Sequence, residues 1–227
     1  MNSHYEMVVF DMAGTTVDEQ NLVYKMLHQT LVDDGYDCSL EMVLAIGAGK
    51  EKKAALKDIL IELGVFAPQL TAASLHSLFK ERLKEAYLLA PITPMPGAEI
   101  VFAQLKLMGI KVILNTGYDR ATAYQLIQRL GWVVGEQIDG LITASDVSLS
   151  RPAPDMIDLA KQQFGIEQSA NVVKVGDSII DIEEGKNAGC GLTVGITTGA
   201  HDEQMLQLAE PNHIIHQLSD LMPLIHS

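Results

Sequence analysis

The chain has 227 residues, of which 48% are hydrophobic, and its formal net charge is −13 at pH 7. This acidic balance argues against a protein that binds nucleic acid or an anionic membrane through a basic surface. The hydrophobic fraction excludes a disordered chain, and the length suits one large α/β domain or a core with a smaller insert.

The N-terminal region predicts a buried strand that ends on an acidic residue. Residues 8–10 read VVF, Asp11 follows, and the turn-forming residues AGTT occupy 13–16. No basic segment precedes this strand and no apolar run reaches about 18 residues, so we expect neither a signal peptide nor a membrane span. Cys38 and Cys190 lie far apart without companion ligands, which predicts two free thiols in a cytoplasmic protein.

Residues 19–93 have the character of a helical block. Amphipathic helical patterns occupy residues 22–35, 52–64 and 74–87. The proline-rich segment 91–97 marks the return to a pattern that contains strands. We therefore predict a core of residues 1–16 plus 94–227, and a helical cap domain at 17–93 that is inserted directly after the first strand.

The second half of the chain alternates short apolar runs with longer helical patterns. The strand patterns occupy residues 110–117, 140–144, 171–177 and 192–199. The helical patterns occupy residues 122–131, 156–165 and 182–189. This alternation is typical of a parallel sheet with right-handed crossovers, so the predicted fold class is α/β with a Rossmann-like parallel-sheet core.

Polar side chains stand at the carboxyl ends of the predicted strands. Asp11, Thr116 and Asp177 each end or follow a strand, Asp181 comes four residues after Asp177, and Asp146 lies near the end of 140–144. A single polar residue at a strand end has an ordinary structural explanation. Because ligands of open parallel sheets bind at the carboxyl ends of the strands, the convergence of these side chains predicts a functional site there.

The predicted site has the chemistry of phosphoryl transfer. Asp11 and Asp177 are hard oxygen ligands suited to Mg²⁺, and a carboxylate beside that metal can attack phosphorus. We expect Thr116 to donate its hydroxyl to a phosphoryl oxygen, and Asp181 to orient the groups around the metal. Arg151 would supply positive charge to the phosphate and to the nucleophile.

The backbone N–H groups of the AGTT turn, Gly14 and Thr15 among them, are further expected donors to the phosphoryl group. The predicted partner is a small phosphorylated or phosphonate metabolite. Nucleic acid and membrane are not expected partners, and a homodimer is left open.

Four segments resemble the motifs of the haloacid dehalogenase superfamily of phosphohydrolases, in the right order and spacing. They are FDMAGTTVD (10–18), LNTGYDR (114–120), SRPAPD (150–155) and VGDSIIDIEEGKNAG (175–189). The resemblance implies that Asp11 is the nucleophile, that Thr116 binds phosphate and that Asp177 binds Mg²⁺. Arg151 then stands where a lysine is more usual, and the helical insert corresponds to a C1-type cap.

Position 13 departs from the common pattern of that superfamily. Ordinary phosphatases carry a second aspartate there, which protonates the leaving oxygen and later activates water, and this chain has Ala13. The sequence DxAGTTxD resembles phosphonoacetaldehyde hydrolases, which cleave a C–P bond. That resemblance implies a cap lysine that forms a Schiff base with the substrate aldehyde, and a metal contact from the Ala13 carbonyl.

By the same resemblance, Lys50 is the candidate Schiff-base lysine, with Lys52 and Lys53 supplying the positive charge that lowers its pKa. Gly117 and Tyr118, in the TGYDR run, are expected to contact the substrate. The alternative for residues 50–53 is a solvated helix start whose lysines face water.

Two other functions remain open from the sequence. The first is hydrolysis of a small phosphate monoester such as phosphoglycolate, which requires a water-activating group from elsewhere, such as Asp18 or the cap. The second is a binding or regulatory protein on a catalytically weak hydrolase scaffold, which Ala13 favours and which the intact Asp11, Thr116, Arg151 and Asp177 disfavour.

Overall fold

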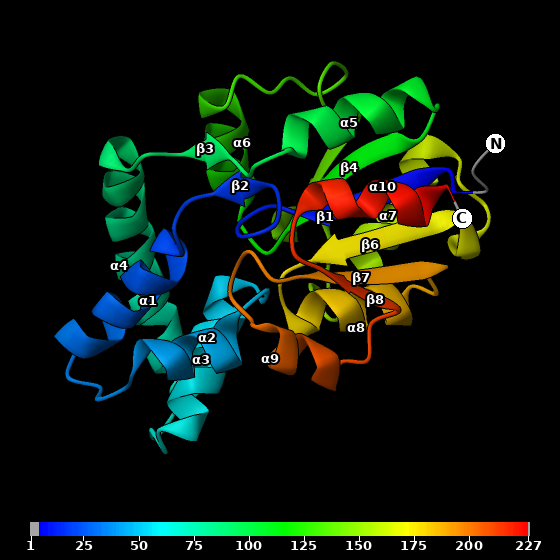
Figure 1. Cartoon of the computed structure of the whole chain (residues 1–227). Helices are drawn as coiled ribbons and strands as arrows, with labels where there is room; N and C mark the ends of the chain where they lie inside the picture. Colours follow the sequence, from blue (N-terminus) through cyan, green and yellow to red (C-terminus); the bar gives the residue numbers. More distant parts are fainter. Residues whose placement is uncertain (1–4, 227) are drawn as a thin grey trace.

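The structure is a computed structural model that describes residues 5–226. The first residues of the predicted core segment, 1–4, and residue 227 lie outside the described residues. Figure 1 shows a sheet flanked by helices, and beside it a separate group of helices.

A six-stranded sheet forms the core, and its strands all run parallel. In spatial order the strands are β5 (Gly140–Thr143), β4 (Lys111–Thr116), β1 (Met7–Asp11), β6 (Val172–Gly176), β7 (Leu192–Ile196) and β8 (His213–Ile215). Strand β1 pairs with β4 on one side and with β6 on the other, so β1 is central. This architecture confirms the predicted Rossmann-like α/β fold.

Helices cover both faces of the sheet. Alternate residues of β1 point to opposite faces: Val8 and Phe10 join the apolar cluster on one face, and Met7 and Val9 join the cluster on the other. The first face carries α5 (Ala98–Leu107), α6 (Arg120–Arg129) and α10 (Leu221–Ile225). The second face carries α7 (Asp155–Phe164), α8 (Ile179–Asn187) and α9 (Glu203–Leu208).

Four helices follow one another in the sequence between the short strands β2 (Val17–Asp18) and β3 (Thr93–Pro94). These two strands pair with each other in antiparallel fashion. The four helices are α1 (Leu22–Asp33), α2 (Leu40–Gly47), α3 (Lys52–Glu62) and α4 (Pro68–Leu89), and we call them the cap helices (Figure 1). The sequence patterns predicted three of them and missed α2. The division of the chain into a core and a cap domain at residues 16–17 and 93–94 stays a prediction.

The missed helix α2 is short and almost wholly apolar, so its sequence carries no clear period. Ser39 begins it by accepting a hydrogen bond from the Met42 N–H at 3.2 Å. Its last residue leads into the loop 48–51, which contacts the core, so α2 positions that loop. None of the helices within residues 5–226 combines the length and the apolar character needed to cross a bilayer.

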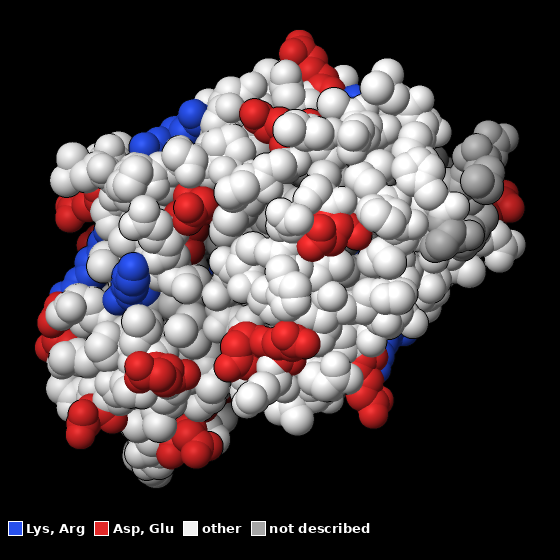
Figure 2. All heavy atoms as spheres, in the orientation of Figure 1, with Lys and Arg blue, Asp and Glu red and all other residues white. Residues whose placement is uncertain are grey.

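Figure 2 shows acidic side chains scattered over the core and the cap on the face in view, with the basic side chains mostly near the cap.

Candidate active site

Three carboxylates meet at the carboxyl edge of the sheet. Asp11 ends β1, Asp177 follows β6, and Asp181 lies in the first turn of α8. All three are buried, and one carboxylate oxygen from each lies within 4.8 Å of the others. The structure therefore brings together Asp11 and Asp177, as predicted, and places Asp181 against them.

The Arg151 guanidinium joins this edge from the loop that precedes α7. Its Nη1 lies 2.6 Å from Asp11 Oδ1 and 3.0 Å from Asp181 Oδ1, and its Nε lies 3.1 Å from Glu184 Oε2. Burial alone would lower the pKa of Arg151, but the surrounding carboxylates outweigh burial and raise it. Arg151 is therefore a permanent cation beside Asp11.

A second buried cation, Lys174, was not predicted. It points from the middle of β6, where its Nζ lies 3.0 Å from both Asp181 Oδ1 and Glu184 Oε2. The same Nζ donates to Asn115 Oδ1 at 2.6 Å. The sequence signal is the lysine inside the apolar run VVKVG, because a charged residue within a buried strand requires partners.

The buried charges at this edge do not balance. Four carboxylates, which we call the acid cluster, face two cations: Asp11, Asp177, Asp181 and Glu184 against Arg151 and Lys174. If all ionise, two negative charges are in excess. Burial raises the pKa of Asp11, and burial together with the charges of Asp11 and Asp181 raises the pKa of Asp177 well above its usual value.

This charge excess fits a divalent cation. The oxygens of Asp11, Asp177 and Asp181 converge, and all three side chains are buried. Carboxylate oxygens are the ligands that Mg²⁺ prefers, and a bound cation would offset the burial and the mutual repulsion that raise the pKa values of Asp11 and Asp177.

Two glycines leave room for the Asp177 carboxylate. A Cβ atom at Gly14 would lie 2.4 Å from Asp177 Oδ2, and one at Gly199 would lie 1.9 Å from the same atom. The carboxylate accepts from Ala200 N at 2.6 Å, and the Thr15 hydroxyl lies at hydrogen-bond range, 3.5 Å from Oδ1. The main chain thus fixes Asp177 from two loops, and only glycine fits at either position.

The AGTT turn is closed by its own hydrogen bonds. The N–H of Gly14 donates to Val17 O at 3.0 Å, and the N–H groups of Thr15 and Thr16 donate to Met12 O at 3.2 and 2.8 Å. The turn also positions Asp177, through the space at Gly14 and the hydroxyl of Thr15. The substrate contacts of Gly14 and Thr15 stay predictions.

The loop between α2 and α3 lies directly on the predicted site. A Cβ at Gly117, in the loop after β4, would lie 2.6 Å from the carbonyl oxygen of Lys50, and a Cβ at Gly49 would lie 2.3 Å from Ser178 Oγ. Thr116, at the end of β4, accepts from Tyr118 N at 3.2 Å. The loop 48–51, which we call the cap loop, therefore covers the carboxyl ends of β4 and β6.

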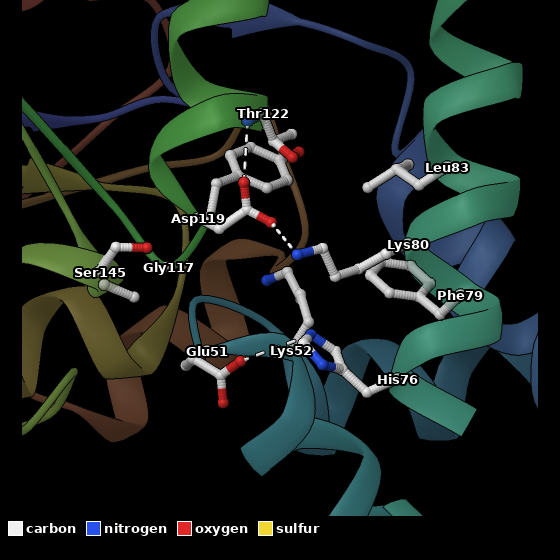
Figure 3. Close-up of a pocket in the computed structure, with 12 residues that line it drawn as sticks. Glu51, Lys52, His76, Phe79, Lys80, Leu83, Gly117, Asp119, Thr122 and Ser145 are labelled. Atoms are coloured by element: carbon white, nitrogen blue, oxygen red, sulfur yellow. Dashed lines mark hydrogen bonds and ion pairs between the residues drawn. The ribbon is translucent and has the colours of Figure 1, made fainter. Parts of the chain in front are cut away.

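A cavity of about 270 Å³ lies between the cap helices and the loop after β4 (Figure 3). Its lining includes Gly117 and Tyr118 from the core and Lys52, His76 and Lys80 from the cap. Lys80 forms an ion pair with Asp119 at 3.1 Å, which joins α4 to the start of α6. The cavity is small beside the pockets of roughly 300–1,000 Å³ that hold drug-sized ligands.

The lysine that faces this cavity is Lys52, not Lys50. Lys50 Nζ forms an ion pair with Asp58 at 2.7 Å, away from the cavity lining. Lys52 Nζ lies 4.9 Å from the centre of the Tyr24 ring and 5.7 Å from that of Tyr118, and it donates to Lys50 O at 2.8 Å. No carboxylate of residues 5–226 lies within ion-pair distance of it.

Burial lowers the pKa of Lys52 to about 8, against the charge of Asp11, which raises it. The sequence did contain a signal for this residue. Lys52 shares the buried face of α3 with Ala55, Leu56 and Ile59, at the spacing that places side chains on one side of a helix. Lys53, one position further, is exposed.

Residues 5–189 match the model of one protein family, described as haloacid dehalogenase-like hydrolase. The chain belongs to this family. A phosphonoacetaldehyde hydrolase of Bacillus cereus is 30% identical over 206 residues, covering 87% of this hydrolase and 77% of the relative. This finding agrees with the resemblance seen in the four motifs.

Solved structures show the same fold in related proteins. The hydrolase aligns with a phosphonoacetaldehyde hydrolase-like protein of Oleispira antarctica at a TM-score of 0.83 and 23% identity, covering 99% and 92% of the two chains. It aligns with a predicted phosphoglycolate phosphatase of Haemophilus somnus at 0.75 and 17%, covering 98% of each. At these identities the structures support the fold alone.

Two other acids of the hydrolase have local partners. Asp146 closes a capping box with Thr143 and forms an ion pair with Arg120, so it is not part of the acid cluster. Asp18 accepts from Gln20 N at 3.0 Å. The roles predicted for Thr116 and for the Ala13 carbonyl stay predictions.

Proposed function

We propose that the hydrolase transfers a phosphoryl group to Asp11 and then to water. The observation that carries this proposal is the acid cluster, with Asp11 bonded to Arg151 at 2.6 Å. The small cavity beside the loop 48–51 is lined by Gly117 and Tyr118, which directly follow Thr116. Arg151 neutralises charge as Asp11 attacks phosphorus, and Thr116 donates to a phosphoryl oxygen. The water that later attacks phosphorus releases Asp11.

The cofactor that we propose is Mg²⁺, held by Asp11, Asp177 and Asp181. The support is the convergence of their oxygens within 4.8 Å and the excess of negative charge. When bound there, Mg²⁺ would supply positive charge to the phosphoryl oxygens. Asp181 is placed closely enough to serve as a ligand or to orient the other two.

We propose a cap domain at residues 17–93 over a core of 1–16 plus 94–227. The contacts of Gly49 with Ser178, and of the Lys50 carbonyl with Gly117, support a cap that closes over the strand ends. Closure of this kind excludes water and selects the substrate by size.

The proposed substrate is a small phosphonate with an aldehyde group, of the kind named for the Bacillus cereus relative. Ala13 offers no acid to a leaving group, and Lys52 supplies an amine in the cavity. With a pKa of about 8, roughly one Lys52 in ten is neutral at pH 7, against about one in 2,500 for an ordinary lysine. The neutral amine attacks the carbonyl carbon, whose oxygen leaves as water, and the resulting iminium accepts the electrons of the C–P bond as phosphorus passes to Asp11. The enamine that remains takes a proton on carbon, and water then releases the aldehyde and regenerates Lys52.

A small phosphate monoester that carries a carboxylate is the second candidate. The observation in its favour is that most Lys52 side chains are still protonated at pH 7 and have no carboxylate partner among residues 5–226. That cation suits a carboxylate such as the one in phosphoglycolate, the substrate named for the Haemophilus somnus protein.

Borohydride trapping distinguishes the candidates. With phosphonoacetaldehyde and Mg²⁺, we expect phosphate release and a reduced adduct on Lys52. Lys52→Met should lose both, and the control Lys50→Met should keep the adduct. Phosphate release from phosphoglycolate without an adduct favours the monoesterase. Binding of either compound without turnover favours the inactive-scaffold alternative and contradicts the proposal.

A further inference from the structure

A buried carboxyl group lies beside the cavity and belongs to neither the acid cluster nor the metal site. Glu19 joins β2 to α1 and is 2% exposed. Its Oε2 accepts from Val23 N at 2.8 Å and from the Tyr87 hydroxyl at 3.1 Å. Its Oε1 is buried without a hydrogen-bond partner in the described part of the chain.

Two hydroxyl groups connect this carboxyl group with the cavity wall. The Tyr87 hydroxyl, from α4, lies 2.7 Å from the Tyr118 hydroxyl, and either oxygen can donate. Tyr118 lines the cavity next to Gly117. The hydrogen bonds therefore run without a gap from Glu19 through Tyr87 to Tyr118, across the linker, the cap and the core.

We infer that Glu19 is the proton store of this site, acting through Tyr87 and Tyr118 in place of the acid that Ala13 lacks. The inference rests on the proposed hydrolase function and adds a group to it. Glu19 is a positioning residue in this scheme, because only Tyr118 among the three hydrogen-bonded side chains lines the cavity.

The direction of the hydrogen bonds depends on the proton of Glu19. When Glu19 is ionised, Tyr87 donates to Oε2 and Tyr118 donates to Tyr87, so Tyr118 can only accept from the cavity. When Glu19 carries a proton on Oε2, it donates to Tyr87, Tyr87 donates to Tyr118, and the Tyr118 O–H is free to donate. One buried proton thus switches Tyr118 between acceptor and donor.

The proton balance follows the two halves of hydrolysis. As the bond from phosphorus to the leaving group breaks, the leaving group takes the Tyr118 proton, on oxygen for a phosphate monoester or on the enamine carbon for the phosphonate. Tyr87 then gives its proton to Tyr118, and Glu19 gives its proton to Tyr87, which leaves Glu19 ionised. When water attacks phosphorus, the bond from Asp11 to phosphorus breaks and the water proton returns through Tyr118 and Tyr87 to Glu19.

The charged and titratable groups around Glu19 suit this role. They are Tyr24 on α1, Lys52 on α3, Tyr87 on α4 and Tyr118 after β4. Burial raises the pKa of Glu19 to about 7, although Val23 N–H, Tyr87 and Lys52 lower it. Burial raises the pKa values of Tyr87 and Tyr118 well above normal, so these phenols pass protons without remaining ionised.

The test is the pH–rate profile of Glu19→Gln with Mg²⁺ and both candidate substrates. Glutamine keeps the shape and an oxygen for Val23 N–H and Tyr87, but it holds no transferable proton. We expect kcat to fall by about 10²-fold or more with little change in KM, and the limb near pH 7 to disappear. Glu19→Asp should restore part of the rate and the limb.

Tyr87→Phe removes the hydroxyl that links Glu19 to Tyr118 but keeps Glu19, so its pH–rate profile should lose the same limb near pH 7. This variant also tests the inference if Glu19→Gln does not fold. Glu62→Gln, at an exposed position of α3, is the matched control and should behave as the unaltered protein. If the unaltered protein turns over and both Glu19→Gln and Tyr87→Phe keep its rate and profile, the inference is wrong while the hydrolase function stands. If the unaltered protein turns over neither substrate, the proposed function fails, and the proton transfer through Glu19, Tyr87 and Tyr118 fails with it.

Discussion

Replacing Lys174 by methionine tests whether the acid cluster is held by its two cations. Lys174 Nζ lies 3.0 Å from both Asp181 and Glu184, and all three side chains are fully buried. Methionine fills similar space without the charge, so two carboxylates lose a partner in a region that water does not reach. Arg151 remains and contacts both carboxylates.

The expected loss of stability is large above neutral pH. Removing one partner of a buried ion pair costs about 3–5 kcal/mol, which corresponds to roughly 10 °C in Tm for a chain of this size. Burial raises the pKa of Asp181, but Arg151 and Lys174 outweigh burial and hold it below its usual range. A carboxyl group with a lowered pKa stabilises the fold above its unfolded pKa and loses that contribution as the pH falls.

The loss should therefore shrink in acid. Without Lys174 the pKa of Asp181 rises, so protonation relieves the excess negative charge more at about pH 5 than at about pH 8. Urea unfolding of the metal-free protein, followed by circular dichroism at both pH values, measures this difference. Lys84→Met, at an exposed position of α4, is the control and should change the free energy of unfolding by less than about 0.5 kcal/mol. Equal losses at the two pH values, or no loss at either, would refute the reasoning.

Three further outcomes are expected. Gly199→Ala places a Cβ 1.9 Å from Asp177 Oδ2, so Mg²⁺ affinity measured by calorimetry should fall at least about tenfold, and unchanged affinity would contradict the placement of Asp177. Mg²⁺ at 100 times its Kd should raise the free energy of unfolding by about 2.7 kcal/mol, an increase that chelation reverses and that Asp177→Asn lacks. The pKa of Glu19 is about 7 in the folded protein against 4.5 in the unfolded chain, so Glu19 lowers the free energy of unfolding by about 3 kcal/mol as the pH rises through that interval. Urea unfolding of Glu19→Gln at several pH values should show that this pH dependence is lost. An unchanged pH dependence would oppose the assignment.

The sequence predicted the sheet and the convergence of Asp11 and Asp177 because both follow from strong local patterns. A buried apolar strand that ends on an acid is readable without coordinates, and parallel strands bring such ends to one edge. Lys174 also has a local signal, because a charged residue inside an apolar strand requires buried partners.

Which lysine faces the cavity depends on where α3 begins. Glu51 starts the helix by accepting from the N–H groups of Lys53 and Ala54, and this places Lys52 in the buried row with Ala55 and Ile59. The family resemblance implies Lys50, whereas the helical period of α3 points to Lys52.

Other features have no local signal. The free space at Gly199 and the hydrogen bonds from Glu19 to Tyr118 join segments that are far apart in the chain. The closed AGTT turn was also beyond reach, since its N–H groups find acceptors only once the turn has its three-dimensional form.

The account depends most on Asp11 as the group that receives phosphorus. Acid quenching of the Mg²⁺-loaded protein within milliseconds of mixing with ³²P-labelled substrate, followed by peptide mapping, tests this directly. We expect transient label on the peptide that contains Asp11, and neither label nor turnover in Asp11→Asn. Label on another residue, or an Asp11→Asn protein that turns over at the normal rate, would contradict the account.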